Sequence, residues 1–205
     1  MSVQPIRIVG DPLLHHRATD VVVDGSGAYS GDTDALIIDM FDTLDASGGV
    51  GLSANQIGSS ARIFVYDCPQ FRGRGTRRRG VLVNPVLQRT SASDHASRPD
   101  IAMEGCLSVP GLMYPTPRAT SVRVRGLDHH GQPVIVHGDG FFARMLQHEI
   151  GHLDGTLYVD VLAETHRRAA HADVSARGWG VPHRSWTPGV DIDPFGSGSP
   201  GDGPW

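Results

Sequence analysis

The strongest chemical signal in this chain is the run Gln-His-Glu-Ile-Gly-His-Leu at positions 147–153. Residues four apart share one face of an α-helix, so His148 and His152 can direct both imidazoles at one metal ion, with Glu149 beside them. A divalent metal lowers the pKa of bound water toward neutrality, and a neighbouring carboxylate can take its proton and pass it to a leaving group. The spacing therefore predicts a metal-dependent hydrolase in which Glu149 is general base and then acid.

Short motifs of this kind also arise by chance, so the surrounding pattern has to support the helix. Asp139 is a suitable N-cap, and Gly155 is a natural C-terminal stop. Between them an apolar stripe is formed by Phe141, Phe142, Met145, Leu146 and Leu153. The two histidines therefore fall inside a predicted amphipathic helix.

A third metal ligand is offered by Cys106, in the segment Glu-Gly-Cys-Leu-Ser-Val-Pro at 104–110. A free cysteine commonly fills a core, but beside a two-histidine helix it completes a three-ligand set that leaves a fourth position for water. A disulfide with Cys68 is the alternative. It is disfavoured because the chain shows no leader, and cytoplasmic cysteines stay reduced.

Length and composition predict one globular domain with an added tail. The chain has 205 residues, 39% of them apolar, a net charge of −4 and a pI near 6.2. This charge argues against DNA or an anionic membrane as a partner. No apolar run is long enough to span a membrane, and no signal peptide is visible, so a cytoplasmic location is expected.

The hydrophobic patterns predict alternating strands and helices. A helix from about Asp34, capped by Asp32 or Thr33, ends at Gly48-Gly49. The stretch 163–177 is rich in Ala, His and Arg, a composition from which a further helix is expected. Strands are expected at 6–9, 61–67 and 81–87, and a hairpin at 120–127 and 133–137, with His129 and His130 exposed in its turn. The arginines between 72 and 79 are predicted to crowd a solvated loop, with a contact to RNA or another acidic partner as the alternative.

Three segments appear in a fixed order: Gly-Val-Gly-Leu-Ser-Ala-Asn-Gln at 49–56, Glu-Gly-Cys-Leu-Ser at 104–108, and Gln-His-Glu-Ile-Gly-His-Leu-Asp-Gly at 147–155. Together they resemble the signature motifs of the peptide deformylase family, over about residues 4–162. That resemblance implies removal of the N-formyl group from the initiator methionine of nascent polypeptides. It also implies an α+β fold with antiparallel β-sheets around a central metal-binding helix that carries His-Glu-x-x-His.

The resemblance assigns roles to individual residues of this chain. It implies a metal held by Cys106, His148 and His152, with Glu149 as the base. The oxyanion would be held by the Gln56 side-chain amide and the Leu107 backbone N–H. The remaining family positions are Gly51, which pairs with the substrate backbone, and the methionine-pocket residues Val50, Phe141 and Met145.

The resemblance also implies Fe²⁺ as the metal, with Ni²⁺, Co²⁺ or Zn²⁺ as substitutes that the ligand set alone does not distinguish. Gly151 departs from the Asp usual in the family. We expect its missing carboxylate to leave Arg118 or Arg144 without a partner and to alter stability or tune the site. Ser53, where the family usually has Ala, receives no role.

Residues 1–162 are predicted to form the catalytic domain, and residues 163–205 a C-terminal helix and a tail rich in Gly and Pro that holds all three tryptophans. Part of 178–195 is expected to dock on the body or on a partner, and a ribosome contact is left open. Two rival functions remain: a metal amidohydrolase or peptidase acting on another acyl group, and a non-catalytic, metal-stabilised binding protein.

Overall fold

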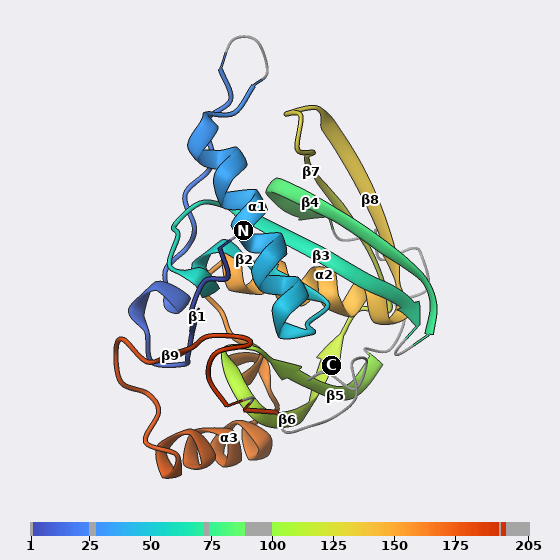
Figure 1. Ribbon diagram of the computed structural model, residues 1–205. Helices are drawn as coiled ribbons and strands as arrows, with labels where there is room; N and C mark the ends of the chain where they lie inside the picture. Colours follow the sequence, from blue (N-terminus) through green and yellow to red (C-terminus); the bar gives the residue numbers. More distant parts are fainter. Residues whose placement is uncertain (1, 25–27, 72–73, 89–99, 193, 196–205) are drawn as a thin grey trace.

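The computed structural model describes residues 2–24, 28–71, 74–88, 100–192 and 194–195. Within these residues the fold is α+β, with antiparallel sheets (Figure 1). One five-stranded sheet has the order β2-β3-β4-β7-β8, and two smaller sheets pair β5 with β6 and β1 with β9. The strands are β1 (Ile6–Arg7), β2 (Gly51–Ser53), β3 (Ile63–Phe71), β4 (Arg74–Gln88), β5 (Asp100–Cys106), β6 (Val109–Arg118), β7 (Ser121–Leu127), β8 (Pro133–Asp139) and β9 (Ser185–Trp186).

The described residues form three α-helices, which pack on these sheets: α1 (Gly31–Ser47), α2 (Gly140–Leu153) and α3 (Glu164–Ala176). Short 3₁₀ turns lie at η1 (Pro12–His15), η2 (Ala54–Ile57) and η3 (Tyr158–Val161). Helix α2 contacts every strand of the five-stranded sheet and also β6, so it lies between that sheet and the β5–β6 hairpin (Figure 1). The predicted α+β fold class with antiparallel sheets is therefore confirmed.

Both faces of strand β3 are buried, because its side chains alternate between the side covered by α1 and the side covered by α2. On β3, Ile63 and Val65 belong to the hydrophobic cluster that includes Met40 of α1. Phe64, the residue between them, belongs to the cluster that includes Phe142 of α2. The sheet thus separates the two cores, and α2 is held against one face by its apolar stripe.

The predicted helix boundaries are close to the observed ones. Helix α1 begins at Gly31 with Ser30 as N-cap, slightly earlier than expected, and ends at Ser47; the C-cap residue Gly48 has a left-handed φ of 66°. Helix α3 at Glu164–Ala176 and the β7–β8 hairpin follow the predictions, and His129 and His130 are exposed in its turn.

The arginine-rich segment is not the loop that was predicted. Residues 74–79 belong to strand β4, where Arg78 pairs in register with Cys68 of β3. Three of these arginines are accommodated by partners: Arg77 bonds Asp67, and Arg79 bonds Asp45 and Asp67. Arg78 lies over the Phe142 ring at 4.1 Å. Arg72 lies outside the described residues.

The β5–β6 hairpin was not predicted. Residues 89–99 lie outside the described residues, and Asp100 begins β5. Strand β6 contains Pro110, Pro115 and Pro117, a composition that argues against a central strand. Proline is tolerated here because β5 and β6 form a two-stranded sheet, in which each strand has one free edge.

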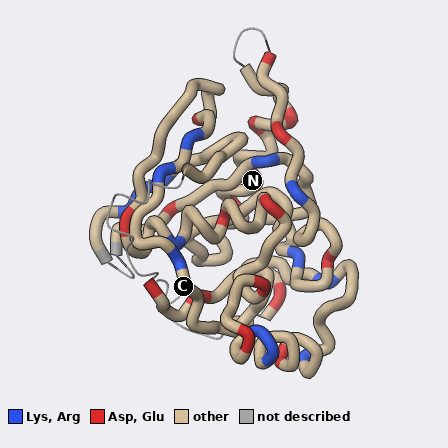
Figure 2. The backbone as a smooth tube through the Cα atoms, turned by 180° about the vertical axis from the view of Figure 1, so that it is seen from behind, with Lys and Arg blue, Asp and Glu red and all other residues tan. Residues whose placement is uncertain are grey.

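Part of the C-terminal tail docks on the body, as predicted. Strand β9 pairs with β1, with Trp186 opposite Ile6, and Trp186 is 7% exposed. Trp179 and Phe195 pack against the core, whereas Trp205 lies outside the described residues. Seen from behind, α3 carries basic and acidic positions close together (Figure 2), and Glu164 pairs there with Arg167 and Arg168. Within the described residues, no helix has the length and apolar character that crossing a membrane requires.

Docking of the tail depends on Gly10. Its φ is +106°, and an added Cβ would collide with the backbone of Gly180 and Val181. We therefore expect Gly10→Ala to displace the tail and to speed trypsin cleavage after Arg177 and Arg184. The control is Gly31→Ala, because a Cβ at Gly31 meets nothing within 4 Å. Equal cleavage rates in both variants would contradict this account.

Candidate metal centre

Helix α2 carries the two histidines and the glutamate into the interior. Asp139 is the N-cap residue, as predicted, although its side chain makes no capping hydrogen bond. The helix ends at Leu153, and Gly155 follows with a left-handed φ of 79°. The apolar side of α2 is packed on the sheet, so His148, Glu149 and His152 are buried between the sheet and the β5–β6 hairpin.

The turn between β5 and β6 brings Cys106 to these histidines. Its Sγ lies 3.1 Å from Nε2 of His152, which lies 3.2 Å from Nε2 of His148. The three ligand atoms all lie within 4.8 Å of one another, and all three residues are buried. Cys106 and Cys68 are both free, in agreement with the preference against a disulfide. The structure therefore brings together the three residues predicted as ligands.

Glu104 forms the layer behind the histidines. Its Oε1 lies 2.7 Å from His148 Nδ1, which leaves Nε2 of that ring directed at Cys106 and His152. A carboxylate in this position fixes both the ring orientation and the tautomer of a metal-binding histidine. Burial alone would raise the pKa of Glu104, but hydrogen bonds from His148 and Arg118 outweigh burial and hold the pKa well below its usual range.

The arginines expected to lack a partner both have one, so that prediction is wrong. Arg118 donates to both oxygens of Glu104, and Arg144 donates to Glu104 Oε2 and to the Asp100 carboxylate. The carboxylate of Glu104 supplies what the missing aspartate was expected to supply. At Gly151 an added Cβ would lie 3.3 Å from the Thr156 carbonyl oxygen, so the helix runs close to the following loop.

Glu149 is held by Ser53, a residue for which no role was predicted. The Ser53 hydroxyl lies 2.7 Å from Glu149 Oε2, whereas Oε1 has no hydrogen-bond partner among the described residues. Burial raises the pKa of Glu149 to about 8. Gly51 allows the carboxylate to lie here, because a Cβ on Gly51 would be 2.5 Å from Oε1.

Gln56 is oriented toward the same cluster. Its Oε1 accepts a hydrogen bond of 2.8 Å from the Ser53 backbone N–H. Its Nε2 lies 3.1 Å from Ser108 Oγ and 3.9 Å from Cys106 Sγ. The amide N–H₂ group therefore faces the cysteine, next to Leu107, which is fully buried.

Of the predicted substrate residues, Gly51 lies directly against the Glu149 side chain. Gly51 belongs to β2, which is an edge strand of the five-stranded sheet. Val50, Phe141 and Met145 belong to one hydrophobic cluster, in which Phe141 is partly buried. Glu104 and Ser53 were not among the predicted site residues. The signal for each was its place inside a quoted motif, but their contacts depend on strands far apart in the sequence.

The donor set fits a divalent cation. Burial raises the pKa of the Cys106 thiol and lowers the pKa of His148 and His152, so the neutral forms are favoured around neutral pH. A thiolate and two neutral imidazoles on buried side chains are ligands typical of Zn²⁺, Fe²⁺ and similar ions.

Metal binding should release a proton. The raised pKa of the Cys106 thiol means that it is protonated at neutral pH without metal, and a metal binds the thiolate. Adding Co²⁺ to metal-free protein in weak buffer should therefore release about one proton per ion. The Kd for Co²⁺ should fall about tenfold for each unit by which the pH rises between about pH 6 and 8. Binding without proton release, at a Kd independent of pH, would contradict the assignment of Cys106 as a ligand.

The Glu104 network should matter for stability. Glu104→Gln would leave Arg144, which is 4% exposed, without its buried counter-charge. We expect the free energy of unfolding to fall by about 3 kcal/mol in chemical denaturation. The matched control is Glu164→Gln on the exposed face of α3, which should cost less than about 1 kcal/mol. Similar losses of unfolding free energy in both variants would contradict the expected contribution of the buried network.

The chain is similar to known proteins over most of its length. A family model described as polypeptide deformylase matches residues 3–168. A peptide deformylase of Mycobacterium sp. (strain JLS) is 56% identical over 196 residues, which cover 96% of this chain and 100% of that protein. One from Mycobacterium marinum is 54% identical over the same shares.

Solved structures agree with these relatives. The peptide deformylase of Thermus thermophilus has a TM-score of 0.69 and 38% identity, covering 85% of this chain and 94% of that chain. The enzyme of Ehrlichia chaffeensis in complex with actinonin has a TM-score of 0.71 and 34% identity, covering 86% and 98%.

Proposed function

Because this chain belongs to the polypeptide deformylase family, whose metal-dependent hydrolases remove the formyl group from N-terminal formylmethionine, we propose that the buried cluster on α2 is the site of that reaction. The observation that carries the proposal is the convergence of Cys106 Sγ with the two Nε2 atoms of His148 and His152 beside the carboxylate of Glu149. Both rival functions predicted from the sequence use the same cluster, so they are separated by assay rather than by geometry.

Cys106, His148 and His152 would hold the metal. A bound divalent ion supplies Lewis acidity and makes a nearby water a better nucleophile at neutral pH. We propose Fe²⁺ as the ion, on family resemblance, with Ni²⁺, Co²⁺ or Zn²⁺ able to occupy the same three ligands. The support from this chain is the chemistry of the donor set, which suits all four.

Glu149 moves the proton. The Ser53 hydroxyl is hydrogen-bonded to Oε2 of Glu149, so Oε1 is the oxygen available to take a proton from the attacking water. The same oxygen then gives the proton to the departing amine nitrogen of methionine, which makes the amine a good leaving group. Burial raises the pKa of this carboxyl to about 8 in the protein without metal, and the charge of a bound cation would lower it toward neutrality, where a group can both accept and return a proton.

Gln56 and Leu107 would stabilise the oxyanion that develops when water adds to the formyl carbon. The Ser53 N–H fixes the oxygen of the Gln56 amide, which leaves its N–H₂ group facing the cluster. Leu107, whose backbone N–H would be the second donor, directly follows Cys106 in the turn. Two positioned donors of this kind, in a site without bulk water, are worth about a hundredfold to a thousandfold each in rate.

The substrate would bind along strand β2. Its position at the edge of the sheet allows an extended peptide to add as a further strand, paired with Gly51. The methionine side chain would lie against Val50, Phe141 and Met145, which already form one apolar cluster. A side chain at Gly51 would both collide with Glu149 and obstruct this approach.

Residues 1–162 would supply the whole catalytic unit, and residues 163–205 an added helix and tail. The match of the family model to residues 3–168 supports a boundary near this point. A cytoplasmic location and a ribosome contact stay predictions.

The decisive test is turnover of a formylated peptide. Metal-loaded protein should release formate from formyl-Met-Ala-Ser but release no acetate from the acetylated analogue. Glu149→Gln should lower kcat by at least about a hundredfold while the protein keeps its metal, because only the proton carrier is lost. Glu164→Gln is the control, since that carboxylate lies on the exposed face of α3.

Each rival makes a different prediction in this assay. Acetate release at a rate comparable to formate release would favour the broader amidohydrolase. Metal-loaded wild-type protein that turns over neither peptide would favour the binding protein.

A further inference from the structure

The indole of Trp186 makes a buried hydrogen bond to the turn that carries Cys106. Its Nε1 donates to the Leu107 carbonyl oxygen at 2.9 Å. Trp186 is 7% exposed and Leu107 is fully buried, so water does not compete for this carbonyl. Trp186 lies beyond residues 3–168, the part of the chain that the family model matches. A residue of the tail therefore directly contacts the turn formed by Cys106, Leu107 and Ser108, the metal-centre turn.

One peptide plane connects Trp186 to the sulfur of Cys106. The Leu107 carbonyl and the Ser108 N–H belong to the same peptide unit, which is planar and trans. The Ser108 N–H donates to Cys106 Sγ at 3.3 Å. Because the unit is rigid, holding its oxygen at one end fixes the direction of the N–H at the other. The indole N–H and the sulfur therefore stand at opposite ends of one rigid group.

The segment that follows β1 contacts the same turn at the next carbonyl. The Val9 N–H donates to the Ser108 carbonyl oxygen at 2.8 Å, and the Gly180 N–H donates to the Val9 carbonyl oxygen at 3.0 Å. Strands β1 and β9 run side by side here (Figure 1). The tail thus reaches the turn by two routes, one through the Trp186 indole and one through the backbone of Val9.

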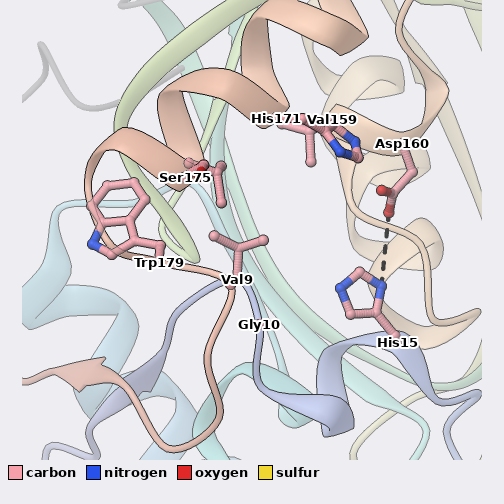
Figure 3. A pocket seen from close by; sticks show the side chains of 10 residues that line it. Val9, Gly10, His15, Val159, Asp160, His171, Ser175 and Trp179 are labelled. Carbon is pink, nitrogen blue, oxygen red and sulfur yellow. Dashed lines mark ion pairs between the residues drawn. The ribbon is translucent and has the colours of Figure 1, made fainter.

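Trp179 lies in the same tail but serves a different contact. It lines a pocket of about 340 Å³ together with Val9, Gly10 and residues of α3, as Figure 3 shows. Across this pocket His15 and Asp160 lie 3.9 Å apart. Trp179 therefore offers a matched comparison: a second partly buried indole of the tail, located on the pocket side.

We propose that Trp186 is a positioning residue for the metal centre, holding the Leu107–Ser108 peptide so that the Ser108 N–H is aimed at the Cys106 sulfur. The inference rests on the proposed role of Cys106 as a metal ligand. A hydrogen bond to a thiolate withdraws charge from the sulfur and orients it, and outer partners of this kind typically affect affinity or activity by about 10- to 100-fold. The same turn carries the Leu107 N–H, so Trp186 also steadies an oxyanion donor.

The test compares Trp186→Phe with Trp179→Phe in Co²⁺-loaded protein. Trp186→Phe keeps an aromatic ring against Phe195 but loses the indole N–H. We expect the sulfur-to-cobalt charge-transfer band to shift to lower energy, because the sulfur keeps more charge. We also expect kcat to fall about tenfold with KM nearly unchanged, because the sulfur and the Leu107 N–H are no longer held in position. Trp179→Phe should leave the band and kcat as in wild-type protein.

A second variant separates the hydrogen bond from packing. Replacing Trp186 by 3-benzothienylalanine keeps the two-ring shape and substitutes sulfur for the N–H, so the fold is preserved even where Trp186→Phe is poorly folded. The same band shift and loss of kcat are expected. Wild-type spectra and turnover in this protein, or equal losses in the Trp179→Phe variant, would overturn the inference. Failure of the wild-type protein itself to bind Co²⁺ or release formate would instead count against the proposed function.

Discussion

The buried carboxylate of Glu104 is the group on which the rest of the centre depends. It lies behind His148, takes hydrogen bonds from Arg118 and Arg144, and so joins β5, β6 and α2 around one charge. A carboxylate in an apolar interior is costly unless every lone pair is used, and here two guanidinium groups and an imidazole use them. This network positions His148, one of the proposed metal ligands, because it fixes the orientation of its ring.

Burial explains why the same few residues can serve both stability and chemistry. Around Glu104 the charges are matched, so the carboxylate stays ionised and rigid. Around Glu149 there is one neutral hydroxyl partner, so burial shifts the pKa upward and leaves one oxygen available. Two carboxylates on neighbouring elements thus acquire opposite properties from their surroundings. In this arrangement one orients a ligand and the other is suited to carry a proton.

The tail extends the support of the centre beyond the residues that the family model matches. Strand β9 is short, yet it places one indole on the turn next to Cys106. Two residues far apart in the sequence contact the metal-centre turn: Gln56 bonds the Ser108 hydroxyl, and Trp186 bonds the Leu107 carbonyl oxygen. Precision in such a site comes from packing and hydrogen bonds around the ligands as much as from the ligands themselves.

The order of residues along the chain was enough to predict hydrolytic chemistry at a metal. It predicted that His148 and His152 share a helix face and that Cys106 is the third metal ligand. Local periodicity sufficed for α1, α2 and the β7–β8 hairpin, and local composition for α3, because neighbours in sequence decide those elements. Contacts between distant segments emerged only from the folded chain: Ser53 with Glu149, Glu104 with both arginines, and Trp186 with Leu107. Strand β6 escaped prediction because its prolines are tolerated only where a strand edge is free. Such contacts depend on how the strands are ordered and how close their backbones come, and no short stretch of sequence encodes either.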